Sequence, residues 1–344
     1  MIRSTMLILF SIIACSPSYH QHGQLYKGIS AYNIGNYHTA IKYFTRIINN
    51  NSENLAPYLY RGHSYAELGE MYLAMNDYNI AISLDRGNPK LYFYLGLSLY
   101  ELKKYPMAIE NYTTSIKLNK EYRDAYANRG WAYIKSDQID AATHDFQFIL
   151  KDSPFFTPAL TGMGRIKLAK NKIKDAHQYL KLAYKNEPNN NGVIRLYADV
   201  ELAAKNYSFA LQLYTKALRI KPNDVGSING KGYALSEVGD KTQAIAEFST
   251  ALNIEPYNIE ALNNRAFTYY ETGYFKQSVN DYNAAIAIQP DRPELYFGRS
   301  QAYQCLSECR LARIDAKTAV DFEKNNEKYQ KQVLLIKQNC PTSW

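Results

Sequence analysis

The fold is decided by a stretch that runs from Leu55 to Asn88 and reads LAPYLYRGHSYAELGEMYLAMNDYNIAISLDRGN. Small and aromatic residues recur in it at intervals of four and then three, which is the spacing of one helical face. Two triplets follow this spacing, namely Tyr58, Gly62 and Tyr65, and then Ala74, Tyr78 and Ala81. The stretch therefore predicts two amphipathic helices, and the Leu68-Gly69 pair between them supplies the break.

The same pattern returns every 34 residues, nine times, with no insertion or deletion. One column of small residues comprises Gly28, Gly62, Gly96, Gly130, Gly164, Ala198, Gly232, Ala266 and Ser300. A second column, twelve residues further on, comprises Ala40, Ala74, Ala108, Ala142, Ala176, Ala210, Ala244, Ser278 and Ala312. Self-similarity at this period is typical of a solenoid, in which each helix pair buries its apolar face against its neighbours.

Glycines and prolines mark the ends of the predicted helices at the same period. The break between the two helices of a repeat carries glycine at Gly35, Gly69, Gly239 and Gly273. The second helix ends near proline at Pro154, Pro188, Pro222, Pro256 and Pro290. Glycine ends a helix in the left-handed conformation without a side-chain penalty, and proline cannot continue a helix.

The order aromatic, Gly, Tyr, then Gly, Ala, aromatic, Ala and Pro resembles the tetratricopeptide repeat, as the stretches from Leu262 to Pro290 and from Tyr58 to Ile82 show. The resemblance covers Gln21 to about Asn326. It implies an all-α fold, a right-handed superhelical α-solenoid of nine 34-residue helix-turn-helix repeats over residues 21–326. Residues 327–344 are expected to form a C-terminal capping helix and tail, because the last repeat otherwise exposes an apolar face.

Five positions depart from the expected apolar or aromatic residues. Gln24 and Lys27 lie in the first copy, Lys167 and Glu201 in the fifth and sixth, and Ala316 in the ninth. Polar residues in a terminal repeat are typical of a cap. The two departures in the middle predict either a change in curvature or a docking surface, and both alternatives stay open.

Residues 1–14 have the features of a signal peptide, with Arg3 followed by a short apolar run. The run ends Ile12-Ile13-Ala14-Cys15, which resembles a bacterial lipobox, and predicts a lipidated Cys15 with a tether over 15–20. Ser16 after the cysteine resembles the pattern sorted to the outer membrane, so we expect a lipid-anchored protein of the bacterial cell envelope facing the periplasm. The alternatives are a plain secretory signal or an uncleaved leader with an incidental cysteine.

Three further cysteines lie near the C-terminus, at Cys305, Cys309 and Cys340. If the terminal helix runs antiparallel to the preceding one, its far end returns beside Cys309, which predicts a possible Cys309–Cys340 disulfide. A bond closing that loop would contribute roughly 3 kcal/mol. The alternative is three buried or idle thiols. A zinc site is disfavoured because no histidine lies nearby in sequence.

Composition argues against nucleic-acid binding and against catalysis. The formal net charge is +8, but the lysines and arginines are dispersed rather than gathered in a basic stripe. The chain contains no Gly-rich phosphate loop, no Gly-x-Ser-x-Gly and no His-Glu-x-x-His, and its six histidines are scattered. The sequence therefore predicts neither an enzyme nor a cofactor or metal site, and most of the 32 tyrosines are assigned to packing.

In the first helix of each repeat, the residues that directly follow the buried positions form a second line of residues, here called the groove stripe. The resemblance implies that the groove stripe lines a concave groove. It includes His63 and Asp199, and its candidate partner-binding residues are Tyr32, Phe93, Tyr100, Trp131, Arg165, Arg195, Tyr233, Phe267 and Tyr270. Binding energy concentrates in Trp, Tyr and Arg. The alternative is that these rings pack between adjacent repeats, and that the arginines pair with neighbours such as Asp199 instead of holding a carboxylate or a peptide terminus.

The sequence thus predicts a non-catalytic scaffold that binds a peptide or helix of a partner protein in the groove. Its layout resembles that of bacterial outer-membrane lipoproteins of this repeat class, which is a fold-level analogy. The alternative is a carbohydrate-binding envelope protein that uses Trp131 and tyrosines as platforms for cell-wall glycan. Sugar platforms would be exposed and flat with polar neighbours, whereas peptide anchors would line pockets along a groove.

Overall fold

The computed structural model describes residues 19–340, which form α-helices joined by short turns and contain no strand. They divide into two compact units, unit 1 ending at Asp152 and unit 2 beginning at Ser153. Unit 1 contains α1 (Tyr19–Asn33), α2 (Tyr37–Asn50), α3 (Leu55–Glu67), α4 (Met71–Leu84), α5 (Pro89–Glu101), α6 (Tyr105–Leu118), α7 (Arg123–Lys135) and α8 (Ile139–Asp152). Unit 2 contains α9 (Thr157–Ala169), α10 (Ile173–Asn186), α11 (Asn191–Ala203), α12 (Tyr207–Ile220), α13 (Val225–Glu237), α14 (Lys241–Ile254), α15 (Ile259–Glu271), α16 (Phe275–Ile288), α17 (Pro293–Cys305), α18 (Cys309–Phe322) and α19 (Glu327–Asn339).

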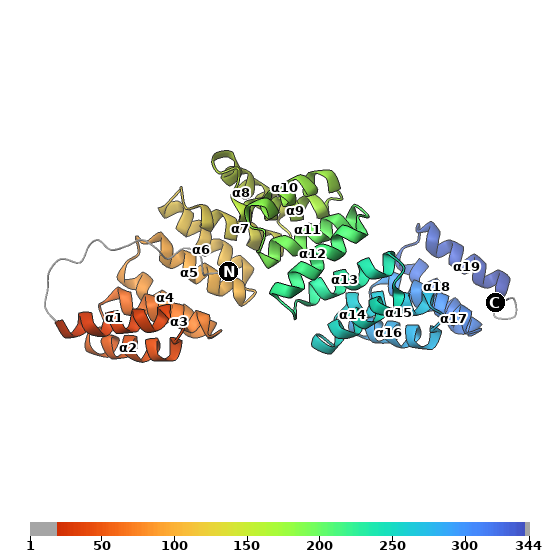
Figure 1. Ribbon diagram of the computed structural model, residues 1–344, viewed down its shortest axis with the longest axis horizontal. Helices are drawn as coiled ribbons and strands as arrows, with labels where there is room; N and C mark the ends of the chain where they lie inside the picture. Colours follow the sequence, from red (N-terminus) through yellow and green to blue (C-terminus); the bar gives the residue numbers. More distant parts are fainter. Residues whose placement is uncertain (1–18, 341–344) are drawn as a thin grey trace. The chain divides into compact units, whose positions relative to one another are not determined.

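Within each unit, consecutive helices pack as hairpins, and each hairpin packs on the next (Figure 1). In unit 1, α1 pairs with α2 and α2 in turn contacts α3, and the same alternation continues to α8. In unit 2 it runs from α9 to α18, and α19 then packs against α18. The all-α architecture and the terminal helix expected from the sequence are confirmed.

The column of small residues exists because a large side chain of the second helix lies against it. A Cβ atom on Gly62 would lie 2.7 Å from Tyr78 Cε1, and one on Gly130 would lie 2.7 Å from two carbons of Phe146. Real Cβ atoms do not approach this closely, so the two helices hold their separation only while the column stays small. The rings themselves are fully buried and fill the space that a side chain on the first helix would otherwise occupy.

The turn between the two helices of each repeat takes the left-handed conformation at one fixed position. Gly35, Gly69, Gly239 and Gly273 have φ between +79° and +96°. The other five repeats adopt it with a side chain present, at Lys103, Asp137, Asn171, Lys205 and Ser307. The geometry of the turn is therefore imposed by the packed hairpin and not by glycine alone, at a conformational cost in those five repeats.

An arginine joins three helices in four of the repeats, a feature that was not predicted from the sequence. In α7, Arg129 donates from Nε and Nη2 to the two carboxylate oxygens of Asp145 in α8, both at 2.8 Å. Its Nη1 donates to Thr113 Oγ1 of the preceding hairpin at 3.0 Å. The same arrangement occurs at Arg61, Arg265 and Arg299 with Asp77, Asp281 and Asp315. Planar, bidentate pairs of this kind fix geometry as well as adding energy.

The C-terminal end of unit 2 is closed by α19. Its Ile336 packs against Ala316, so the aromatic residue missing from the ninth repeat is replaced by a side chain of the terminal helix. A disulfide joins Cys309 at the start of α18 to Cys340 after the end of α19, with the Cα atoms 5.7 Å apart. Leu334 occupies the small-residue position and is exposed, because no further helix packs on it in the described part of the chain.

Candidate functional site

In unit 1, the aromatic residues of the groove stripe take part in packing. Phe93 is only 8% exposed and lies against Tyr94, Tyr112 and Tyr122, with ring centroids 5.0–5.9 Å apart. A ring buried to this extent is not available as an anchor, so the packing alternative describes Phe93.

The other three groove rings of unit 1 are half-buried. Tyr100 contacts Tyr105 edge-on, with the ring centroids 5.4 Å apart, and Tyr32 lies 5.6 Å from Tyr37. Trp131 stands edge-on to Phe146 at 6.0 Å. Each of these rings keeps only part of its surface for a partner.

His63 of the groove stripe is enclosed by four tyrosines. Its ring lies 4.3 Å from that of Tyr94 and within 6.3 Å of those of Tyr32, Tyr60 and Tyr78, and its Nδ1 lies 2.8 Å from the Tyr78 hydroxyl. Burial lowers the pKa of His63 to about 4. The imidazole is therefore neutral at physiological pH and belongs to the core of unit 1.

The arginines of the groove stripe lie in unit 2 beside acidic partners. Arg195 Nε is 3.6 Å from Asp224 Oδ2, and the Tyr214 hydroxyl donates to Asp199 at 2.6 Å. Burial raises the pKa of Asp199, and this shift is opposed by the Tyr214 hydrogen bond and by the charges of Arg195 and Arg165. The two arginines are thus already partly neutralised by the fold, which weakens their role as a carboxylate clamp.

The polar departures in the middle of the chain also find partners within unit 2. Glu201 is buried, accepts from Asn206 Nδ2 at 2.7 Å and lies 3.1 Å from His177 Nε2. Lys167 lies 3.6 Å from Asp175. A buried, hydrogen-bonded Glu201 is not a docking residue, so the structure accounts for this departure by local pairing.

A cavity of about 220 Å³ lies in unit 2, at the part of the groove stripe that carries Tyr233 and Phe267. These two rings occupy equivalent positions on α13 and α15 and are 40% and 44% exposed, in contrast to the packed Phe93. Phe297 of α17 adds a third ring to the lining. Tyr270 lies further along α15, half-buried, with its ring 6.4 Å from Phe267 and 6.0 Å from Phe275.

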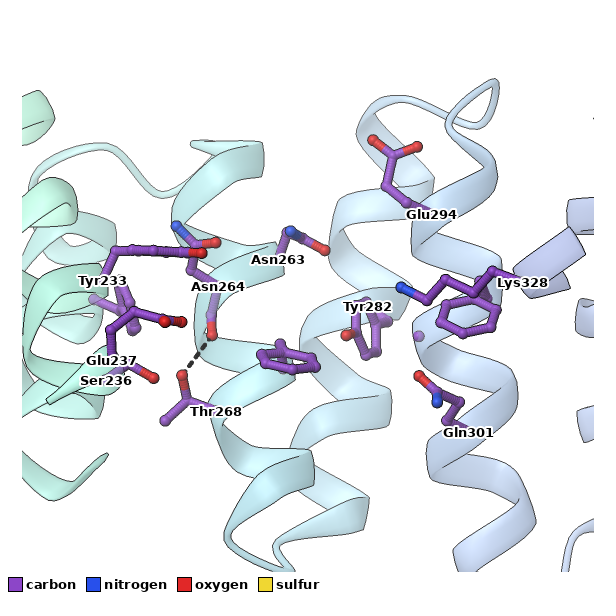
Figure 2. A pocket seen from close by; sticks show the side chains of 14 residues that line it. Tyr233, Ser236, Glu237, Asn263, Asn264, Thr268, Tyr282, Glu294, Gln301 and Lys328 are labelled. Atoms are coloured by element: carbon purple, nitrogen blue, oxygen red, sulfur yellow. Dashed lines mark hydrogen bonds between the residues drawn. The ribbon is translucent and has the colours of Figure 1, made fainter. Parts of the chain in front are cut away.

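Polar side chains surround the rings of this cavity. Figure 2 shows Asn264, Ser236 and Glu237 on the side of Tyr233, and Gln301 and Lys328 on the opposite side. Lys328 comes from α19 and holds its Nζ 4.5 Å from the centroid of Phe297. Asn264 donates to Asn229 Oδ1 at 3.2 Å. Aromatic surface edged by amides can bury an apolar side chain while hydrogen-bonding the polar groups beside it.

Several of these lining residues are not among those predicted from the sequence, although the repeat period contains a signal for most of them. Asn263 and Phe297 lie two and three periods after Arg195, and Gln301 lies one period after Phe267, so the columns that gave the groove stripe already pointed to them. Lys328 follows the ninth repeat and belongs to no complete column. Only the packing of α19 brings it to the cavity.

Two negative observations bear on the chemistry of the described residues. Across residues 19–340, no three His, Cys, Asp or Glu side chains converge to hold a metal ion. None of the helices in that range combines the length and the apolarity needed to cross a bilayer. The predicted lipidation site, Cys15, and the signal peptide lie outside the described residues.

Comparison with known proteins places the chain in a family. Five stretches match family descriptions that read tetratricopeptide repeat or TPR repeat, over residues 23–54, 89–122, 161–225, 225–258 and 268–306. The chain therefore belongs to the tetratricopeptide repeat family, and the class of protein that this fold and groove define is a protein-interaction scaffold. No curated protein matches the chain.

Solved structures resemble the chain at low sequence identity. A tetratricopeptide repeat protein from Parabacteroides merdae is 14% identical, with a TM-score of 0.54 over 72% of this chain and 98% of that one. MamA is 24% identical, with a TM-score of 0.43 over 47% of this chain and 94% of that one. YrrB, described as a TPR protein with an unusual peptide-binding site, is 21% identical, with a TM-score of 0.44 over 58% and 99%. The first of these likenesses shows the shared fold alone.

Proposed function

We propose that this protein is a non-catalytic adaptor that holds a segment of a partner protein against the groove stripe of unit 2. The observation that carries the proposal is the exposure of Tyr233 and Phe267 beside a cavity, at positions where the fold needs no ring. The equivalent position is Asp199 one repeat earlier and Gln301 one repeat later. Exposed aromatic side chains at the wall of a cavity are the usual anchors of a protein interface.

The proposal is tested by site-specific photocrosslinking in the producing cells. A photoreactive amino acid placed at Phe267, and in a second strain at Tyr233, should capture the same partner protein. Tyr257, which is 80% exposed and does not line the cavity, serves as the control position. Equal capture from Tyr257 and Phe267 would contradict a groove-specific interaction.

The purified pair would then give the energetic contribution of the anchors. Phe267→Ala and Tyr233→Ala should each weaken binding by tenfold or more, because truncating a hot-spot ring costs about 2 kcal/mol. Tyr257→Ala should leave the affinity unchanged. Retention of helicity, measured by circular dichroism, separates lost contacts from lost folding.

We also propose that Cys15 carries the lipid that anchors this adaptor in the bacterial cell envelope, at the outer membrane. Support comes from the apolar run and the lipobox-like Ile12-Ile13-Ala14-Cys15. Several acyl chains on one cysteine would give lasting attachment, since each buried methylene contributes about 0.8 kcal/mol. Cys15→Ser should move the protein from the membrane fraction to the soluble fraction, and retention in the membrane fraction would overturn the assignment.

One observation favours the second candidate function, carbohydrate binding, at a different place. Tyr257 stands in an open hollow of about 560 Å³ that is also lined by Asn258, Gln289 and Arg292. Three of the other four proline turns carry Asn or Asp at this position, as in Asn223, and the fourth carries Phe155. A flat, exposed ring with polar neighbours suits a sugar ring. Soluble cell-wall glycan fragments should then bind the wild type and Phe267→Ala equally, and Tyr257→Ala weakly.

A further inference from the structure

Four tyrosines occupy one column of the second helices, and each faces a residue of the groove stripe fifteen positions earlier. The tyrosines are Tyr78, Tyr112, Tyr214 and Tyr282, and the residues facing them are His63, Leu97, Asp199 and Phe267. Where the facing residue is polar, the two side chains form a hydrogen bond. The Tyr78 hydroxyl lies 2.8 Å from His63 Nδ1, and the Tyr214 hydroxyl donates to Asp199 Oδ1 at 2.6 Å.

At the other two positions the facing residue cannot accept a hydrogen bond. Leu97 and Phe267 are hydrocarbons at their tips. Within residues 19–340 the Tyr112 hydroxyl is buried without a hydrogen-bond partner, whereas the Tyr282 hydroxyl is not among the buried unpaired atoms. Tyr282 is only 2% exposed. Its ring is therefore buried while its hydroxyl keeps accessible surface, so a polar group that enters the cavity can pair with it.

Tyr282 and Tyr112 differ in the residue of the following helix that lies next to the tyrosine ring. Sixteen positions after Tyr282 stands Gly298, and a Cβ atom there would overlap Cζ and the hydroxyl oxygen of the tyrosine. The corresponding residue for Tyr112 is Asn128. Because Gly298 has no side chain, Tyr282 reaches the groove and joins the lining of the 220 Å³ cavity, between α15 and α17 (Figure 2). The unpartnered hydroxyl thus faces the space where a partner segment would lie.

The size and walls of the cavity restrict what can enter. Its volume of about 220 Å³ lies below the range of roughly 300–1,000 Å³ that holds a whole small ligand, so it suits one inserted side chain. Phe267, Tyr233 and Phe297 offer ring surface on the walls. Burial raises the pKa of Tyr282, so its phenol stays protonated and can both donate and accept. A planar side chain with a polar tip matches this combination.

Charge favours a neutral occupant. The charged residues of the lining are Glu237, Glu294 and Lys328. Glu294 accepts from Arg292 at 2.6 Å, and the Lys328 ammonium lies over the ring of Phe297. With Glu294 paired to Arg292, the charges of Glu237 and Lys328 balance, so the lining offers no net positive charge to a carboxylate at the tip of the inserted side chain. The ring walls suit an aromatic ring better than an aliphatic amide.

We infer that this cavity is a specificity pocket for a tyrosine side chain of the partner segment, whose hydroxyl pairs with that of Tyr282. The inference rests on the proposed function, since it names one residue of the segment that the groove would hold. Phe267 and Phe297 pack against the inserted ring, and the absence of a side chain at Gly298 lets the Tyr282 hydroxyl reach it.

The test uses p-cresol, the side-chain analogue of tyrosine, and toluene, which differs from it by the hydroxyl alone. Ligand-detected NMR titrations of the full chain should show p-cresol binding about tenfold more tightly than toluene, as one buried neutral hydrogen bond predicts. In Tyr282→Phe this preference should fall to twofold or less. Equal binding of the two probes to the wild type, or an unchanged preference in Tyr282→Phe, would overturn the inference.

A matched control comes from the same column. Tyr214→Phe removes the hydrogen bond to Asp199 and lies outside the cavity lining, so it should keep the full preference for p-cresol. Tyr282→Phe loses no hydrogen bond within residues 19–340, and its melting temperature should match that of the wild type. A crystal of the wild type soaked in p-cresol gives a test that needs no variant, because the ring must lie between Phe267 and Phe297 with its hydroxyl beside Tyr282.

The two proposals fail separately. Photocrosslinking that captures a partner at Phe267, together with equal binding of p-cresol and toluene, would overturn the tyrosine pocket and leave the adaptor standing. A clear p-cresol preference without any partner captured at Phe267 would overturn the adaptor and leave a phenol-binding pocket.

Discussion

Breaking the arginine–aspartate pair in α7 and α8 should destabilise unit 1, and replacing both partners together should restore most of the loss. The side chain of Asp145 is only 2% exposed and that of Arg129 is 14% exposed. Removing one member of a buried ion pair typically costs 3–5 kcal/mol, because the remaining charge has lost its partner. Arg129→Leu strands the deeply buried carboxylate, so we expect about 4 kcal/mol, whereas Asp145→Asn leaves a partly hydrated guanidinium and should cost about 3 kcal/mol.

The chain itself supplies the double variant. In the preceding repeat the two equivalent positions are Leu95 and Asn111, which shows that this hairpin also packs with an uncharged pair. The double variant with Arg129→Leu and Asp145→Asn should therefore cost only about 1–2 kcal/mol, well below the sum of the single variants. The guanidinium bond to Thr113 is lost in the double variant as well, which is why recovery is incomplete.

Urea unfolding followed by circular dichroism at 222 nm measures the four members of this cycle. The coupling between the two sites should reach several kcal/mol, and the transition affected should be that of unit 1 if the two units unfold separately. Additive single losses would refute the reasoning, because they would mean that the two side chains stabilise the hairpin independently of each other.

Three further predictions follow from local geometry. Lys103→Gly should raise the free energy of unfolding by about 0.5–1 kcal/mol, because Lys103 holds a left-handed φ of +58°. Gly69→Lys at the equivalent turn should lower the free energy of unfolding. A loss of stability in Lys103→Gly would contradict this account. Burial lowers the pKa of His63 from 6.5 to about 4. Between these pH values the unfolded chain binds a proton that the folded chain does not. The free energy of unfolding should therefore fall by roughly 3 kcal/mol as the pH drops from 6.5 to 4. His63→Phe should remove that part of the pH dependence, which urea titrations at several pH values would measure. Replacing Cys309 and Cys340 with serine should lower stability by about 3 kcal/mol, since the bond closes a 31-residue separation, and an unchanged unfolding midpoint with and without reductant would argue against the bond.

The repeat and its helices could be predicted from the sequence because their causes are local. The spacing of Tyr58, Gly62 and Tyr65 fixes one helical face, and Gly69 fixes the turn. The left-handed conformation at Lys103 and Lys205 could not be predicted from the residue types, since lysine does not prefer that conformation. The 34-residue period predicts where these two turns lie, and the packing of the hairpin imposes their backbone conformation.

The candidate site was harder to predict because exposure depends on neighbours from other helices. Phe93 and Phe267 both lie on the groove stripe, yet Tyr112 and Tyr122 cover Phe93 while Phe267 borders a cavity. From the sequence, packing between repeats and partner binding were both open for each of these two rings. Their difference in exposure became visible only with all the contacting helices in place.

The sequence by itself determined that this chain is an α-helical array of nine repeats with a groove stripe, because a strict period of 34 residues leaves only one way to bury each helix pair. Only the tertiary structure decided which side chains of the groove stripe are exposed and which are covered by neighbouring helices. Tyr282 shows the reason, because the state of its hydroxyl depends both on Phe267, which cannot accept a hydrogen bond, and on Gly298, whose missing side chain makes room for the tyrosine. The meeting of these three residues from three helices is a result of packing, and the repeat pattern of the sequence does not predict it.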